Sequence, residues 1–484
     1  MSRPKVLLLT SSLLVDRVFV HTNLIKTLRR YGETIVWAVS RGNDQNCSVW
    51  ENSFARVERF PRVEPFKAFP YVYLRRLNEF AWDFRHRIPT RMSVQQHVRD
   101  KDQPLSVRAL KLPARIVAAC RAEQLLESCV EKLLLRCKRS AEAIERLQEM
   151  RPSVIVATGA FQFEQPAIFA AAKKLGIPTL AYIPSWDNIT TKNRMVFKYD
   201  GYLVWSEQTK SELHQFYPAS KRAPVYVVGA PQFDMFYQKR FYETREDFCR
   251  SQGLDPNLPI VVYAIGSPNF LQEHHGAIEL AKRITEGKLG TIQMLIRPHP
   301  IHDNAALGRV FEEYAPRVRL QQTHNAGKAV AERTQDERQI REWINTFRHA
   351  DVLINLASTV TVDAAIFDCP VINLDFDPQP DQADQALVKD INHRWNHFKP
   401  VAESGGVRLV KNYEELTAAI LSYLQDRTLG REGREQIVRH VCEYTDGKCG
   451  ERLARAVIDF AMPEPRLSTG EFRASTQFET IEQL

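Results

Sequence analysis

Residues 351–375, DVLINLASTVTVDAAIFDCPVINLD, decide the fold of this chain. Two short apolar runs, 351–358 and 370–376, predict strands that are buried on both faces, because their hydrophobic residues are continuous rather than alternating. The residues between them, TVTVDAAIF, predict a helix. A helix between two buried strands implies a parallel pair joined by a right-handed crossover. This stretch therefore predicts an α/β unit.

The same alternation of apolar runs and helical patterns fills most of the chain, in two series. The first series comprises 5–11, 34–40, 153–159, 179–185, 201–206 and 224–231, and the second comprises 259–267, 291–300, 317–323, 351–358, 370–376 and 407–411. A charged segment, 238–258, separates the two series. We therefore expect two tandem Rossmann-like α/β domains, with boundaries at 1–237 and 238–450, followed by a closing helix at 451–462 and a mobile tail at 463–484.

Composition and charge exclude few partners. The 484 residues are 44% hydrophobic and 26% charged, which is typical of a globular protein of two or three domains. The formal net charge of +8 favours anionic partners, but it is too small to distinguish nucleic acid from phosphorylated metabolites or anionic lipid. Because the basic and aromatic segments contain no RNP-like or helix-turn-helix pattern, no nucleic-acid partner is expected.

The cysteines and the apolar runs indicate a cytoplasmic protein. The eight cysteines form no CxxC pair and no Cys/His cluster, so neither a zinc site nor a disulfide framework is expected. The apolar start KVLLLTSSLLV is followed directly by Asp16 and Arg17 without a cleavage site, which favours a buried strand over a signal peptide. No run approaches the ~20 apolar residues that span a bilayer, so any membrane contact is expected to be peripheral, at the inner face.

A long insertion, at about 50–150, interrupts the first domain. Its first part, 54–91, holds nine Lys/Arg against four acidic residues, together with nine aromatic residues. Its second part, 105–148, predicts long basic helices. The insertion either packs on its own domain and presents a solvated basic face, or docks on an anionic membrane or a lipid-linked acceptor.

Ser358 and Thr359 stand where the quoted strand ends and its helix begins. The hydroxyl groups and the free amides of a helix start favour a phosphate group, so we expect an anion site here. The alternative is that the pair only caps its own helix.

Two further loops of the second domain are expected at the same edge of the sheet. Arg297-Pro298-His299-Pro300 follows the strand TIQMLI, and Gly266-Ser267 follows the strand PIVVYAI. An arginine offers a forked donor to phosphate, a histidine offers a donor or a proton, and the prolines stiffen the loop. Ligands of open α/β sheets bind beyond the carboxyl ends of the strands, where these loops should meet. The alternative for His299 is a structural turn histidine.

This combination of features resembles the GT-B glycosyltransferase fold. Within that fold, the RPHP loop and the strand-Ser/Thr-helix motif are similar to those of the CDP-glycerol glycerophosphotransferase-like and HP-motif transferases of surface polysaccharide synthesis. The resemblance implies that His299, Pro300, Ser358 and Thr359 hold the phosphates of a nucleotide donor in the second domain. It also implies an acceptor site in the first domain.

A transferase also needs a base for the acceptor hydroxyl. Asp187 follows the strand TLAYIP and is the first candidate, with Trp186 beside it as a stacking surface for a sugar. An Asp-Asn turn with the tryptophan in the core explains the same residues. Asp16 and His21, at the first strand-to-helix turn, are further candidates for the base.

No metal or cofactor is expected. The sequence Asp375-Phe376-Asp377 imitates a metal-binding DxD motif, but its position after a late strand of the second domain does not suit metal chelation. We therefore expect a metal-independent transferase, inverting if it transfers a sugar, that moves a glycosyl or polyol-phosphate group from a nucleotide-activated donor to a saccharide or lipid-linked acceptor. The alternatives are a nucleotide-sugar epimerase of the same fold and a catalytically silent scaffold that binds a partner.

Overall fold

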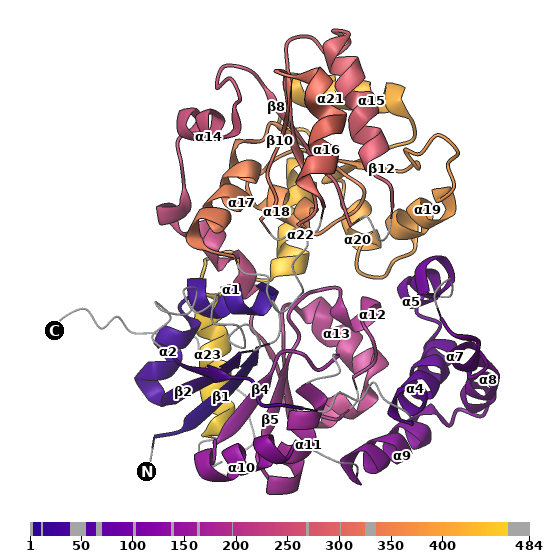
Figure 1. The fold of residues 1–484 in the computed structure, drawn as a ribbon, viewed down its shortest axis with the longest axis vertical. Helices are drawn as coiled ribbons and strands as arrows, with labels where there is room; N and C mark the ends of the chain where they lie inside the picture. The colour runs from indigo at the N-terminus through magenta and orange to yellow at the C-terminus, as the bar shows by residue number, and fades with distance from the viewer. Residues whose placement is uncertain are drawn as a thin grey trace, which may run out of the picture.

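The computed structural model describes residues 3–10, 13–38, 55–63, 70–99, 103–136, 140–161, 165–195, 197–267, 271–300, 302–324 and 335–462. Two sheets, each surrounded by helices, form the lower and upper halves of the molecule in Figure 1. This arrangement confirms the predicted α/β class with two Rossmann-like domains. The expected tail, 463–484, lies outside the described residues.

The first sheet has seven parallel strands in the order β3-β2-β1-β4-β5-β6-β7. The chain reverses its direction of winding between β1 and β4, as in a doubly wound fold. The strands are β1 (Lys5–Thr10), β2 (Glu33–Ala38), β3 (Arg56–Arg59), β4 (Val154–Ala157), β5 (Thr179–Tyr182), β6 (Gly201–Val204) and β7 (Val225–Val227). The helices of this half are α1 (Leu13–His21), α2 (Leu24–Tyr31), α11 (Gln165–Leu175), α12 (Asn188–Thr191), α13 (Glu207–Phe216) and the 3-10 turns η4 (Pro218–Arg222), η5 (Pro231–Tyr237) and η6 (Lys239–Phe241).

The second sheet has six parallel strands in the order β10-β9-β8-β11-β12-β13. Its winding reverses between β8 and β11, which places a crevice at the carboxyl ends of these two strands. The strands are β8 (Ile260–Ala264), β9 (Gln293–Arg297), β10 (Val318–Leu320), β11 (Val352–Asn355), β12 (Val371–Leu374) and β13 (Val407–Val410). The helices are α14 (Arg245–Gln252), α15 (His274–Thr285), α16 (Asn304–Phe311), η7 (Glu312–Tyr314), α17 (Glu337–His349), α18 (Val360–Ile366), α19 (Gln385–His393), α20 (Lys399–Ala402), α21 (Tyr413–Gln425) and α22 (Arg431–Cys442).

The insertion follows β3, and its helices between residues 71 and 136 form a separate group at the side of the first domain (Figure 1). The expectation that the whole of 54–91 belongs to it was wrong for 56–59, which form β3 at the edge of the first sheet. Short helices replace the expected long ones: α4 (Tyr71–His86), α5 (Pro89–Val94), the π-helix η3 (Gln95–Arg99), α7 (Leu105–Arg108), α8 (Lys111–Ala119), α9 (Glu123–Arg136) and α10 (Ala141–Met150).

The insertion also contacts the second domain. The Thr90 Oγ1 hydroxyl of α5 donates to Asn396 Oδ1 at 3.1 Å, and the Asn396 amide donates back to Thr90 Oγ1 at 2.7 Å. His97 Nε2 lies 3.7 Å from an oxygen of Asp390 on α19. The insertion therefore links the two domains on the side where α5 faces α19 (Figure 1).

The last helix, α23 (Cys449–Ala461), returns to the first domain and packs against α2, β4 and β6. Asp234 of η5 accepts hydrogen bonds from the Cys449 and Gly450 amides at 3.0 and 2.7 Å. A Cβ atom on Gly450 would lie 2.6 Å from Thr22 Oγ1, so glycine is required for this close approach. The chain thus crosses between the domains twice.

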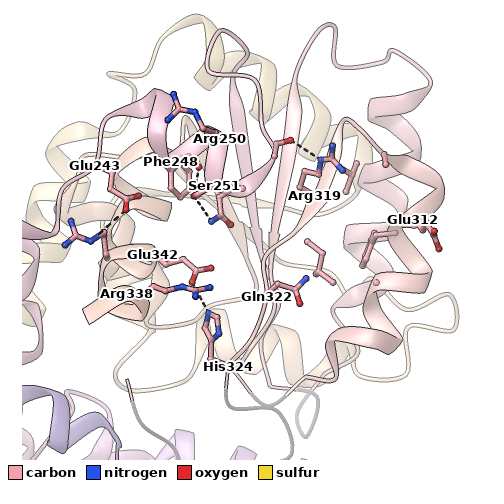
Figure 2. Close-up of a pocket in the computed structure, with 18 residues that line it drawn as sticks. Glu243, Phe248, Arg250, Ser251, Glu312, Arg319, Gln322, His324, Arg338 and Glu342 are labelled. Atoms are coloured by element: carbon pink, nitrogen blue, oxygen red, sulfur yellow. Dashed lines mark hydrogen bonds and ion pairs between the residues drawn. The ribbon is translucent and has the colours of Figure 1, made fainter. Parts of the chain in front are cut away.

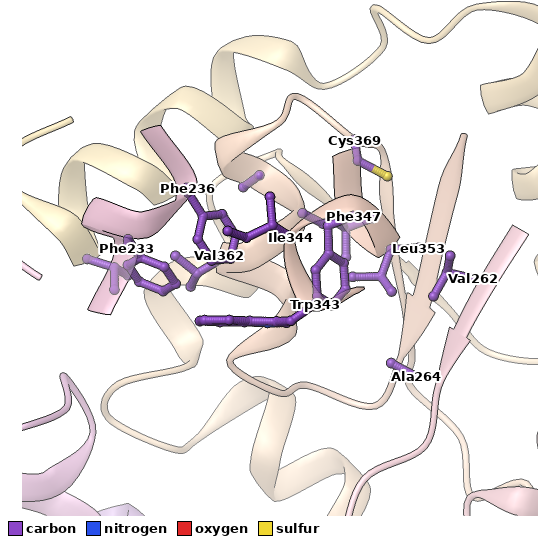
Figure 3. Packing of buried hydrophobic residues seen from close by; sticks show 14 of the residues in the cluster. Phe233, Phe236, Val262, Ala264, Trp343, Ile344, Phe347, Leu353, Val362 and Cys369 are labelled. Carbon is purple, nitrogen blue, oxygen red and sulfur yellow. The ribbon is translucent and has the colours of Figure 1, made fainter. Parts of the chain in front are cut away.

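Helix α17 supports the face of the second domain that meets the first. Asp336 and Gln339 form a capping box at its start, in which each side chain accepts from the other residue's backbone amide. Trp343, Ile344 and Phe347 lie on its buried face. The Trp343 ring meets the Phe236 ring of the interdomain segment edge-on at 4.7 Å (Figure 3). One apolar core therefore continues from the second domain into the connection between the domains.

Candidate functional site

A cavity of about 290 Å³ lies between the two domains. The second domain lines it with the loops that follow β8, β9, β10 and β11, all at the carboxyl edge of the sheet. The first domain and the connection contribute Arg17, Ser185 and Gln232. Of the predicted donor residues, the cavity brings together Gly266, Arg297, His299, Pro300, Ser358 and Thr359.

The loop after β9 presents Arg297 and His299 to the cavity. Arg297 Nη1 donates to Gln321 Oε1 at the end of β10, and its guanidinium lies 5.6 Å from the centre of the Phe347 ring. Burial lowers the pKa of Arg297, while Glu342 and Asp363 act in the opposite direction. The arginine is thus a fixed, partly desolvated cation, whose charge acts more strongly on an anion than it would in water.

The loop after β11 turns sharply before α18. Ala357 adopts a positive φ of 67°, which is strained for a residue with a side chain. The Ser358 amide donates to Asn355 Oδ1 at 2.9 Å, so the strand's own last residue fixes the turn. Thr359 precedes α18, but its side chain makes no capping hydrogen bond. Helix capping therefore does not explain why a hydroxyl residue stands at 359.

The loop after β8 is held from two sides. His302 Nε2 lies 3.1 Å from the Gly266 carbonyl oxygen, and a Cβ atom on Gly266 would lie 2.3 Å from Glu273 Oε1. Burial raises the pKa of Glu273 to about 7, although the Gly266 amide acts in the opposite direction. A larger residue at 266 would therefore have to displace the Glu273 carboxyl group. Ser267, the next residue, is half-buried but does not line the cavity.

Arg17, Trp343 and Asp363 form a buried group at the other side of the cavity. The Arg17 guanidinium lies 4.3 Å from the centre of the Trp343 ring, and Trp343 Nε1 donates to Asp363 Oδ2 at 2.9 Å. Burial raises the pKa of Asp363 to about 6, while Trp343, Arg17 and Arg297 act to lower it. The sequence patterns did not indicate Arg17 or Asp363 as site residues, although Asp363 lies within the strand-helix-strand stretch 351–375.

Asp187 and Trp186 do not line this cavity. Asp187 Oδ1 accepts from Ser185 Oγ at 2.5 Å, and Asp187 Oδ2 accepts from Thr191 Oγ1 at 2.8 Å. The Trp186 side chain is buried and meets the His397 ring edge-on at 5.1 Å. The structure therefore places both residues behind Ser185, which itself reaches the cavity.

Asp16 and His21 are buried on α1 and also lie outside the cavity lining. His21 Nε2 lies 3.2 Å from the Gln335 carbonyl oxygen, and burial lowers the pKa of its imidazole. Between them on the same helix, Arg17 reaches the cavity. The roles of Asp187, Asp16 and His21 as bases stay predictions.

Among the described residues, no group of three or more His, Cys, Asp or Glu side chains is arranged to hold a metal ion. The carboxylates of the DxD-like sequence make contacts within the protein. Asp375 Oδ1 lies 2.8 Å from His393 Nε2, and Asp377 Oδ2 accepts from the Asp384 amide at 2.6 Å. Within the same residues, no helix is long and apolar enough to cross a membrane.

A larger cavity of about 850 Å³ runs beside the edge strand β10, between α14, α16 and α17 (Figure 2). Arginine and glutamate side chains line it, and Glu243 lies 3.9 Å from Arg341. His324 and Glu342, 3.0 Å apart, line both this cavity and the smaller one. The smaller cavity collects the strand-end loops, so it is the candidate active site.

Two Rossmann-like sheets, with a cavity between the domains at the carboxyl ends of the second sheet's strands, define the GT-B class of glycosyltransferases and related epimerases. The family model of CDP-glycerol:poly(glycerophosphate) glycerophosphotransferases matches residues 167–459. This match covers more than half of the chain, and the chain belongs to that family. A comparison with curated protein sequences gave no match.

Solved structures of the same fold are similar over almost the whole chain. S. aureus MnaA, determined with UDP, has a TM-score of 0.54 at 12% identity and covers 97% of this chain and 100% of its own. A putative UDP-N-acetylglucosamine 2-epimerase of Listeria monocytogenes gives 0.53 at 13% identity, covering 95% and 97%. A glycosyltransferase of Rickettsia africae gives 0.52 at 12% identity, covering 96% and 100%. At these identities the likeness shows the fold alone.

Proposed function

We propose that this protein is a metal-independent transferase that moves a polyol-phosphate or glycosyl group from a nucleotide-activated donor to a saccharide or lipid-linked acceptor in surface polysaccharide synthesis. One observation carries the proposal: Arg297, His299, Ser358 and Thr359, from two separate loops, line a single cavity between the domains. Membership of the glycerophosphotransferase family makes a CDP-activated polyol the first donor to test.

The cavity suits the diphosphate of a nucleotide. Arg297 and His299 offer donors to a phosphate group, and the Ser358 and Thr359 hydroxyls add two more. Gln321, Gln335 and Gln339 also line the cavity, but their Oε1 atoms already accept hydrogen bonds from Arg297, Arg17 and the Asp336 amide. The diphosphate would lie over the strand-end loops.

The chemistry needs stabilisation of negative charge and removal of one proton. When the acceptor oxygen attacks, charge develops on the leaving phosphate, and Arg297 and His299 would stabilise it without a metal ion. In glycosyl transfer the acceptor would approach from the first domain, and direct attack on the face of the anomeric carbon opposite the leaving phosphate would invert the sugar. The base would come from that domain, with Asp187, Asp16 and His21 as the candidates.

The first domain would bind the acceptor, and the insertion would bring the protein to the inner face of an anionic membrane. Helix α9 separates its charges by face. The acidic side chains Glu123, Glu127 and Glu131 turn inward and pair with Arg85, Arg194 and Lys198 at 3.7, 2.9 and 3.7 Å.

The exposed surface of α7, α8 and α9, here called their outward face, is both apolar and basic. Five aliphatic side chains are exposed there by 46–79%: Leu105, Leu112, Ile116, Leu125 and Leu133. The basic residues Arg108, Arg115, Arg121, Lys132 and Arg136 are exposed among them. Apolar side chains that insert among acyl chains, surrounded by cations that meet acidic headgroups, are the features of a helix that lies on a membrane surface.

An epimerase is the second candidate, because solved structures of this fold include a UDP-N-acetylglucosamine 2-epimerase and a putative one. It would convert the bound sugar without an acceptor, so a product analysis separates it from a transferase. A silent scaffold would bind no nucleotide.

A thermal-shift screen with CMP, CDP, UDP, GDP and ADP tests the nucleotide site. We expect nucleotides with one particular nucleobase to raise the melting temperature selectively, because a ligand that binds only the folded state stabilises it. His299→Ala and Ser358→Ala should each weaken the binding of that nucleotide by about 10–100-fold, since each removes a charge-assisted contact, and both variants should keep the fold. His275→Ala, which lines a separate hollow, is the matched control.

The proposal fails if no nucleotide shifts the wild-type protein, or if both variants bind as the wild type does. Turnover with the selected donor should survive EDTA, because arginine and histidine supply the positive charge.

A further inference from the structure

Arg17 is the only charged residue that the described part of the first domain contributes to the active-site cavity. It lies on α1, the helix that follows β1. Its side chain is only 8% exposed although it carries a charge. A buried arginine is costly unless its donors are used, so its surroundings are informative.

Two neutral side chains accept hydrogen bonds from the terminal nitrogens of this arginine, and its third nitrogen, Nε, has no partner among the described residues. One terminal nitrogen donates to Gln232 Oε1 at 2.7 Å, and the other donates to Gln335 Oε1 at 3.2 Å. The Nε atom is buried. Burial lowers the pKa of Arg17 to about 10, so the side chain still carries its charge at neutral pH.

The nearby acid does not satisfy this cation. Asp363 uses one oxygen to accept from Trp343 Nε1, and its other oxygen, Oδ1, is buried without a partner in the same part of the chain. Arg297 lies in the same lining, and its charge lowers the pKa of Arg17. Two arginines from opposite domains thus share a small cavity in which neither donates to Asp363.

We propose that Arg17 binds the distal phosphate of the nucleotide-activated donor, so that Arg17 and Arg297 hold the diphosphate from the two domains at once. The proposal rests on the nucleotide-dependent function argued above. The strand-end loops of the second domain would hold the proximal phosphate beside Arg297, so the distal phosphate would face the first domain, where Arg17 is the available cation.

The contact serves either form of the transfer. In polyol-phosphate transfer the acceptor oxygen bonds to the distal phosphorus, the bond from that phosphorus to the bridging oxygen breaks, and a nucleoside monophosphate leaves. In glycosyl transfer the acceptor oxygen bonds to the anomeric carbon, the bond to the distal phosphate oxygen breaks, and a nucleoside diphosphate leaves. In both cases the acceptor's proton goes to the base, and Arg17 neutralises charge on the distal phosphate.

The competing explanation is that Arg17 is a structural link between the domains. Titration calorimetry with the mono- and diphosphate of the base chosen by the screen, starting with CMP and CDP, separates the two. We expect Arg17→Ala to weaken the binding of CDP by about 10–100-fold. The affinity for CMP should change by no more than about twofold, because only CDP carries the distal phosphate. Arg17→Lys should recover part of the loss, since it keeps the charge without the planar fork.

Arg30→Ala, at an exposed arginine of α2 in the same domain, should change neither affinity. Equal losses for CMP and CDP in Arg17→Ala, together with a lower melting temperature, would assign Arg17 a structural role and overturn the proposal. Unchanged CDP binding would also overturn it, while the proposed function would stand. If the wild type bound none of the nucleotides, the proposed function itself would fall, and the role of Arg17 with it.

Discussion

At Asp187, neighbouring groups shift the pKa of the carboxyl group in the direction opposite to burial. Burial alone would raise the pKa of its carboxyl group, but His397, Lys192 and the hydrogen bonds from Ser185 and Thr191 lower it. Burial also lowers the pKa of His397 to about 4, so this histidine is neutral at pH 7 and contributes no charge there. We therefore attribute the lowered pKa of Asp187 to the hydroxyl donors and Lys192. A carboxylate held in this way stays ionised but accepts a proton reluctantly.

Asp187→Asn distinguishes a base from a structural carboxylate. If Asp187 takes the acceptor's proton, as the sequence predicts, turnover should fall by about 10²–10⁴-fold with nucleotide affinity intact. Thr191→Val removes one of the same hydrogen bonds but no basic oxygen, and it should retain turnover. Steady-state kinetics and calorimetry on both variants give the answer. Normal turnover in Asp187→Asn would move the search to Asp16 and His21.

Strands and helices were predictable to different degrees. The buried strands were found because a central strand of a parallel sheet must be apolar on both faces. The edge strand β3 was not found, because its sequence RVER buries only Val57 and half-buries Glu58, with charged residues on either side. The strand-end loops could be predicted to converge because parallel strands end at one edge. Arg17 could not, because its position in the cavity depends on how two domains meet, which no local pattern encodes.

The outward face of α7, α8 and α9 gives a prediction for this group of helices. Wild-type protein should float with vesicles of phosphatidylglycerol and phosphatidylcholine at low salt, and much less with phosphatidylcholine alone. Salt should weaken the binding, because exposed charges are screened over about 8 Å at physiological ionic strength. The double variant Leu112→Asp/Ile116→Asp should no longer float.

Leu421→Asp, at an exposed leucine of α21 in the other domain, is the control and should float like the wild type. Equal flotation of Leu112→Asp/Ile116→Asp and the wild type would show that this face does not touch the membrane.

A buried glutamate near the contact between the two domains has a raised pKa. Glu212 of α13 shares a small internal hollow with His397 and His440 of the second domain. Burial and the charge of Asp187 raise the pKa of Glu212 to about 7, against a bond from Gln208 that lowers it. The folded protein therefore binds a proton at Glu212 that the unfolded chain has released above about pH 4.5.

The effect of Glu212→Gln on stability should consequently depend on pH. Since the folded-state pKa is raised, wild-type Glu212 is neutral at pH 5 and charged at pH 8, and its contribution to stability falls as pH rises from about 4.5 to 7. The variant should match the wild type at pH 5 and be more stable at pH 8, by up to about 3 kcal/mol. Urea unfolding at both pH values measures the difference. A difference independent of pH would contradict the raised pKa.

The return of α23 to the first domain has a consequence for the order in which the protein is made. Synthesis releases the strands of the first sheet long before residues 449–461 leave the ribosome, and domains otherwise tend to fold as they emerge. Until α23 arrives, the surfaces of α2, β4 and β6 that it covers stay open to solvent. Until then the Asp234 carboxylate also lacks its two hydrogen-bond donors, the Cys449 and Gly450 amides. The first domain to be translated is therefore the last to be completed. A nascent chain stalled before residue 449 would expose the surface that α23 normally covers, and chaperones could bind it.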